Sequence, residues 1–147
     1  MLVRLLYVSR SAESIGAAAV DSILAQSRAR NPELGITGLL CYGGDIFLQV
    51  LEGGRRPVND LYAQIVRDGR HRDVMLLAYH EVAERKFASW TMGVVNLDRI
   101  NPSVLLKHSE RAVLDPYAVS GHASMALLEE LILTASILGR AEAARPV

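Results

Sequence analysis

Hydrophobic residues gather in five short runs of the chain, each with the length and composition of a β-strand. The runs cover residues 2–9, 36–42, 46–51, 74–82 and 91–97. Two intervening segments, residues 14–30 and 58–68, carry apolar side chains at helical spacing instead. This order of elements predicts an α+β fold, a ferredoxin-like, five-stranded mixed sheet with two helices on one face.

Proline and glycine residues mark where these elements end. Asn31 precedes Pro32, and because a residue before proline avoids the α region, the first helix is predicted to end there. Gly43 and Gly44 separate the second and third runs and predict a tight hairpin, since its turn needs positive φ at both positions.

The pattern changes after Asp98, which predicts a core domain over residues 1–97 and a C-terminal helical extension over residues 98–147. Asn101 before Pro102 predicts the start of a short helix. Ser120 or Ser124 is the predicted N-cap of a longer helix that runs to Gly139.

The longer helix carries an apolar stripe with two compatible interpretations. Its residues are Leu128, Leu131, Ile132, Ala135 and Leu138. The stripe either covers the sheet face that the first two helices leave open, or forms a surface for a partner or a second copy. Residues 141–147 are expected to be a frayed tail.

Composition excludes several classes of protein. Sixteen basic residues balance sixteen acidic ones, so no summed field favours nucleic acid or an anionic membrane. The single cysteine, Cys41, excludes an internal disulfide and fits a reducing compartment. No secretory signal pattern is present, and the late apolar run 131–138 is far shorter than the ~20 residues of a bilayer span. We therefore expect a cytoplasmic protein. The four histidines lack metal-ligand spacing.

Gln49 places an amide in the middle of an apolar strand. Burying an unpartnered amide costs roughly 1–3 kcal/mol, so Gln49 is either a satisfied core residue or part of a polar site. Tyr7 lies in the first strand and needs a partner for its hydroxyl. A face of the first helix carries Ile23, Ser27 and Asn31, and Ile65 occupies the matching face of the second. Together these side chains would form an apolar slot with polar edges, suited to a planar heteroaromatic ring.

Four separated motifs resemble the BLUF photoreceptors, whose name stands for blue light using flavin. They are Tyr7, the segment NPELGITGLL at 31–40, the segment FLQVLEG at 47–53, and SWTM at 89–92. The resemblance extends over about residues 1–97.

The resemblance implies that the protein binds FAD non-covalently between its two helices, with FMN as a possible alternative. Tyr7 and Gln49 match the photochemical pair, and Trp90 and Met92 match a signal relay near the glutamine. The cofactor-binding positions would be Asn31, Ser27, Ile23, Ile65, Asp68 and His71. Arg30 replaces an asparagine found in some members and could reach a flavin phosphate.

The implied function is photosensory signalling and not enzymatic catalysis. Light-driven electron and proton transfer along Tyr7, Gln49 and the flavin would leave Gln49 rotated or tautomerised. The change would pass through Trp90 and Met92 to the C-terminal helices and on to a protein partner. Candidate partners are a response-regulator-like protein or a cyclic-di-GMP phosphodiesterase, and a homo-oligomer is expected.

Two other classes of function remain open from the sequence. A ferredoxin-like enzyme of the acylphosphatase type would need an anion-binding loop, for which Ser9-Arg10-Ser11 is a weak candidate without glycines. A chromophore-less adaptor is the other alternative. Taken one by one, Tyr7 and Gln49 could be core residues, Asp68 a turn cap and His71 part of a solvated loop.

Overall fold

The computed structural model describes residues 1–12, 17–134 and 138–140. The core elements are β1 (Leu2–Ser11), α1 (Ala17–Leu34), β2 (Thr37–Gly43), β3 (Ile46–Gly54), α2 (Arg55–Arg67), β4 (His71–Val82) and β5 (Trp90–Asn96). The elements that follow are the 3-10 helix η1 (Leu97–Arg99), α3 (Pro102–His108), α4 (Gly121–Leu133) and β6 (Leu138–Arg140).

The strands form one mixed sheet in the order β4-β1-β3-β2-β5-β6. β1 pairs antiparallel with both β3 and β4, and β2 pairs antiparallel with β3 and parallel with β5. This arrangement confirms the ferredoxin-like fold, to which the three residues of β6 add a short strand on the β5 edge.

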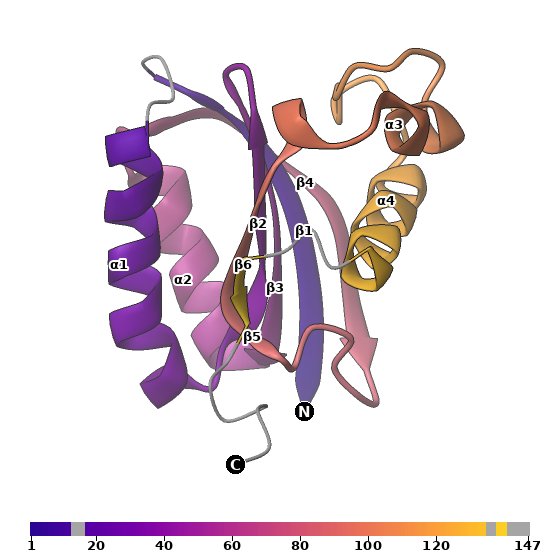
Figure 1. The fold of residues 1–147 in the computed structure, drawn as a ribbon. Coiled ribbons are helices and arrows are strands. Elements are labelled where there is room, and N and C mark those ends of the chain that lie inside the picture. The colour runs from indigo at the N-terminus through magenta and orange to yellow at the C-terminus, as the bar shows by residue number, and fades with distance from the viewer. Residues whose placement is uncertain (13–16, 135–137, 141–147) are drawn as a thin grey trace.

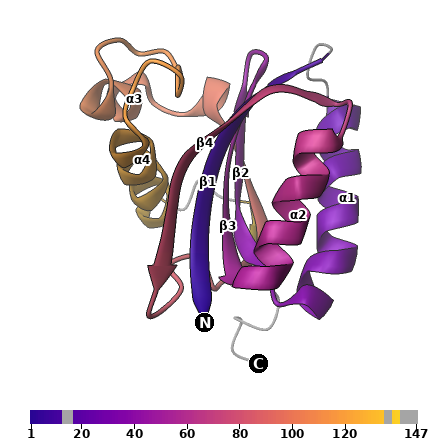
Figure 2. The same cartoon turned by 180° about the vertical axis from the view of Figure 1, so that it is seen from behind.

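Helices cover both faces of the sheet. α1 and α2 pack on one face, and α3 and α4 lie on the other (Figures 1 and 2). The neighbouring interior strands β1 and β3 are therefore buried on both sides, which explains their continuous apolar runs. None of the helices in the described ranges is long and apolar enough to cross a membrane.

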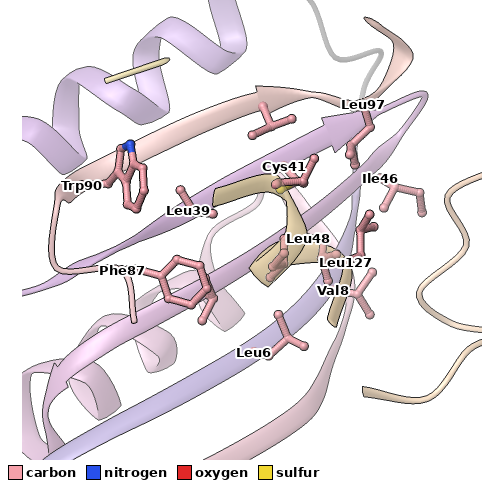
Figure 3. Close-up of a cluster of buried hydrophobic side chains, with 14 of the residues drawn as sticks. Leu6, Val8, Leu39, Cys41, Ile46, Leu48, Phe87, Trp90, Leu97 and Leu127 are labelled. Carbon is pink, nitrogen blue, oxygen red and sulfur yellow. The ribbon is translucent and has the colours of Figure 1, made fainter. Parts of the chain in front are cut away.

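Each face has its own hydrophobic core. On the α1/α2 face, Leu5, Tyr7 and Phe47 pack with Leu24 and Val58. The other core, shown in Figure 3, includes Leu6, Val8, Leu39, Cys41, Leu48, Phe87, Trp90 and Leu127.

The end of α1 differs from the predicted stop at Asn31–Pro32. The helix continues to Leu34 and closes at Gly35, whose φ is +68°. The Gly35 N–H donates to the Pro32 carbonyl at 3.3 Å, and the Ile36 N–H donates to the Asn31 carbonyl at 2.9 Å. These two bonds form a Schellman cap, so glycine terminates the helix and proline is accommodated in its last turn. The predicted first residues of this helix, 14–16, lie outside the described residues.

The end of α4 also differs from the prediction. Ser120 is its N-cap and accepts from the Ala123 N–H at 3.0 Å, but the helix ends at Leu133 and not at Gly139. Leu138 pairs with Val94 in β6, because the open edge of β5 offers backbone hydrogen-bond partners to this segment. The predicted stripe is therefore divided: Leu128 and Leu131 are buried on the sheet, and Ile132 packs against them. Ala135 and the predicted tail 141–147 lie outside the described residues.

The short helix after Asn101 begins as predicted. The Asn101 side chain accepts from the Ser103 N–H at 3.0 Å, and Pro102 occupies the first turn. Together with α4, whose Leu128 and Leu131 are buried on the sheet, this helix lies on the face that α1 and α2 leave open.

Candidate functional site

A pocket of about 750 Å³ lies between α1, α2 and the sheet. Its volume is in the range typical of small-molecule sites. All nine residues predicted for photochemistry or cofactor binding line it: Tyr7, Ile23, Ser27, Arg30, Asn31, Gln49, Ile65, Asp68 and His71. The structure therefore brings together side chains from three strands, two helices and the turn that follows α2.

Tyr7 and Gln49 are cross-strand partners on β1 and β3. The Tyr7 hydroxyl donates to Oε1 of Gln49, and both side chains are buried. Burial raises the pKa of Tyr7 far above its ordinary value, so the hydroxyl keeps its proton and remains a donor. On its other side, Nε2 of Gln49 donates to the sulfur of Met92 at 3.2 Å. The amide thus accepts from a strong partner and donates to a weak one.

Three pocket residues follow one another along the inner face of α1. The Ser27 hydroxyl donates to the Ile23 carbonyl at 3.0 Å, one helical turn earlier. Asn31 is only 2% exposed, and its Nδ2 donates to the Thr91 carbonyl at 3.1 Å. Asn31 therefore ties the end of α1 to β5 at the pocket wall. Arg30 is exposed at the rim.

Asp68 and Arg70 form a tight pair at the end of α2. The Arg70 main chain donates to Asp68 Oδ1 at 2.9 Å, and its guanidinium donates to Oδ2 at 2.7 Å. The hydrogen bonds from Arg70 lower the pKa of Asp68, and the same pairing raises that of Arg70. Arg70 also donates to Oε1 of Gln26 at 3.0 Å, which bridges this turn to α1. Asp68 does cap a turn, and its side chain also borders the pocket.

His71 belongs to β4 and not to a solvated loop. β4 begins three residues before the predicted strand, so His71 pairs with Ser11 and lies partly buried. Its Nδ1 is 2.8 Å from the Ser9 hydroxyl, and its ring contacts that of Phe47 with centroids 5.1 Å apart. Burial lowers the pKa of His71 below its ordinary value, which favours the neutral ring.

The two predicted relay residues lie on opposite faces of the sheet. Met92 is buried beside Gln49 in the core under α1 and α2. Trp90 is buried with Phe87 and Leu39 in the core under α4 (Figure 3). Within the described residues, Nε1 of Trp90 is buried without a hydrogen-bond partner. Of the two predicted relay residues, it is therefore Met92 that contacts Gln49 in this arrangement.

Ten further residues line the pocket and were not predicted. They are Gln26, Glu33, Leu34, Leu40, Arg56, Pro57, Asp60, Leu61, Gln64 and Arg70. The helical spacing of Pro57, Leu61 and Ile65 carries the signal for the α2 members. Arg70 has no such signal, because its place depends on the turn after α2.

The residues of the pocket fit a flavin. Apolar surface for a flat ring comes from Ile23, Leu40, Leu61 and Ile65. The buried amides of Gln49 and Asn31 supply hydrogen-bond donors and acceptors. Exposed arginines at the rim, Arg30 and Arg56, offer charge to phosphate groups. No group of three or more metal-ligating side chains occurs in the described part of the chain.

Comparison with known proteins gives a consistent result. The photoactivated adenylate cyclase subunit beta of Euglena longa is 34% identical over 92 residues, which cover 62% of this chain and 11% of that protein. The chain thus spans about a tenth of that relative. The photo-activated structure of BlsA matches with a TM-score of 0.80 and 30% identity over 90% of this chain and 96% of that chain. The dark-state structure of BlrB, a BLUF protein, matches with a TM-score of 0.76 and the same identity and coverage.

A family profile decides the assignment. The profile described as "Sensors of blue-light using FAD" matches residues 2–93, which contain every residue that lines the pocket. The chain belongs to the BLUF family of blue-light sensors that use FAD.

Proposed function

We propose that this protein is a blue-light photoreceptor that holds FAD non-covalently in the pocket between α1 and α2 and signals to a protein partner. The observation that carries this proposal is the continuous set of side-chain contacts from Tyr7 through Gln49 to Met92 at the pocket wall. When bound, FAD supplies the absorption of blue light and an electron acceptor.

Tyr7 is suited to supply both an electron and a proton. Its hydroxyl is protonated, buried and already donating to Gln49, so the amide oxygen is a direct acceptor for its proton. Gln49 is suited to change its bonding, because a sulfur acceptor holds its N–H weakly. If the electron and proton return to Tyr7, a Gln49 side chain left rotated or tautomerised is the only lasting change.

The remaining predicted residues hold the cofactor. Ile23 and Ile65 would sandwich the ring, and the Asn31 amide would meet its polar edge. Asp68 and His71 would lie near the ribityl chain, and Arg30 would reach a phosphate. FAD is the cofactor in the family description, and FMN remains an alternative for the same slot.

The signal is proposed to leave through β5 and the C-terminal helices to another protein. The Euglena longa relative is an adenylate cyclase subunit, so in that protein a similar domain belongs to an enzyme. For this chain, a response-regulator-like protein or a cyclic-di-GMP phosphodiesterase is the proposed class of partner, and a homo-oligomer is the proposed state. The enzyme alternative loses support, because Ser9 is bonded to His71 and the Arg10 guanidinium contacts Asp45 and Tyr117.

The proposal is tested by purifying the protein and identifying its chromophore. We expect a yellow preparation that releases FAD on denaturation, and an absorption spectrum that shifts to the red under blue light and reverts in the dark. A protein that binds no flavin, or a bound flavin whose spectrum is unchanged by light, would contradict it.

A further inference from the structure

Glu52 on β3 is a carboxylate with no solvent exposure. It follows Gln49 by three residues and therefore points to the opposite face of the sheet, with the core under α4. Its cross-strand partner on β1 is Arg4, whose Nε donates to Oε2 of Glu52 at 2.7 Å. A charge in such a place is stabilised only by complete hydrogen bonding.

The other donors to Glu52 come from the connection between β4 and β5. The Lys86 N–H donates to Oε2 at 3.0 Å, and the Phe87 N–H donates to Oε1 at 2.7 Å. The guanidinium of Arg4 also donates to the Glu84 carbonyl at 3.4 Å. One buried ion pair thus holds the main chain of Glu84, Lys86 and Phe87 in this connection against β1 and β3.

From this anchor the chain leads directly into β5. Phe87 is fully buried, and its carbonyl accepts from the Trp90 N–H at 3.2 Å, where β5 begins. Two residues later, the Met92 sulfur meets Nε2 of Gln49. The side chain of Lys86 also forms an ion pair with Glu129 of α4, so the same connection touches the C-terminal helices.

We propose that Glu52 is a positioning residue for the Gln49–Met92 contact: it holds the β4–β5 connection in place, and so determines where β5 begins and where the Met92 sulfur lies. The inference rests on the proposed photoreceptor function for the meaning of that contact. Glu52 does not line the pocket, and the hydrogen bonds described above lead from it to Arg4 and the β4–β5 connection, so the proposed path to Met92 runs through that connection and β5.

The first test uses the apoprotein and the fluorescence of Trp90, the single tryptophan of the chain. Glu52→Gln keeps the shape of the side chain but presents an amide N–H₂ to groups that are themselves donors. We expect its Trp90 emission to shift to longer wavelength and to be quenched more strongly by acrylamide. Lys86→Ala is the matched control, because it keeps the main-chain donor and loses only the ion pair with Glu129. Emission of Glu52→Gln equal to wild type would overturn the proposal.

The second test separates positioning from general stability in the FAD-loaded protein. Glu52→Gln should change the rate at which the red-shifted state reverts to the dark state, and Met92→Leu should change this rate too. If Glu52 acts through Met92, the double variant should recover no differently from Met92→Leu alone. Independent, multiplicative effects on the rate would contradict the proposal.

Two further outcomes have defined meanings. Should Glu52→Gln not fold, hydrogen exchange in the wild-type protein decides: slow exchange of the Lys86 and Phe87 amides supports the anchor, and exchange as fast as in an open loop overturns it. A wild-type protein that binds FAD without any red shift would refute the photoreceptor function, while the apoprotein fluorescence would still decide whether Glu52 holds the connection.

Discussion

The two faces of the sheet are built from the same strands but packed in different ways. Under α3 and α4 the side chains form a closed apolar core, whose buried carboxylate, Glu52, has a full set of donors. Under α1 and α2 the core leaves a pocket of about 750 Å³, with Tyr7 and Gln49 at its wall. Strand alternation explains the difference: it places Gln49, the amide proposed for photochemistry, on one face, and Glu52, the carboxylate proposed to hold the β4–β5 connection, on the other.

The largest expected effect of a single substitution on stability is in the closed core. Leu128 is fully buried on α4, so Leu128→Ala should lower the free energy of unfolding of the apoprotein by about 2–5 kcal/mol. Leu61→Ala makes the same chemical change at the pocket, where the side chain is only partly buried, and should cost clearly less. Urea denaturation of both variants checks this. A larger loss for Leu61→Ala would reverse the comparison.

A smaller effect is expected for cofactor affinity on the pocket face. Asn31→Ala removes the amide that holds the Thr91 carbonyl and borders the pocket. Leaving buried groups unpaired should weaken FAD binding by about 1–3 kcal/mol. Titration of the apoprotein with FAD measures it, and Asn59→Ala is the control because it makes the same chemical change at an exposed position of α2 that does not line the pocket. FAD affinity equal to wild type in Asn31→Ala would refute the assigned role of Asn31.

The smallest effect concerns pH and also belongs to the pocket face. Burial lowers the pKa of His71 below its ordinary 6.5, so the unfolded chain binds a proton more readily than the folded one. The free energy of unfolding should therefore fall as the pH is lowered below about 6.5, and His71→Gln should show a weaker dependence. Denaturation at a series of pH values compares the two. A stability that rises on acidification because of His71 would mean that the ring is charged in the folded state.

Much of this architecture could be predicted from the sequence, because alternation and helical spacing are local properties. The five core strands, both pocket helices and the shared face of Ile23, Ser27 and Asn31 follow from them. The buried amide of Gln49 also indicated that a partner was needed. That Tyr7 is this partner depends on the register of β1 and β3, which involves residues far apart in the chain.

Where the structure differs from the sequence predictions, the physical causes lie outside short sequence patterns. Trp90 and Met92 are two residues apart, which predicts one face of a strand, yet they lie on opposite faces where the pairing of β5 with β6 is irregular. Gly35 closes α1 through its positive φ, although Pro32 is the more conspicuous helix breaker. β6 forms because the edge of β5 is available, a condition that exists only in the folded sheet.

The most direct test of the central claim is the light-minus-dark absorption spectrum of three proteins loaded with FAD: wild type, Tyr7→Phe and Gln49→Leu. The account predicts a reversible red shift in wild type. It predicts that both variants keep the flavin and lose the shift, because each breaks the hydrogen bond between Tyr7 and Gln49. The same red-shifted product in either variant would contradict the assignment of Tyr7 and Gln49 as the photochemical pair.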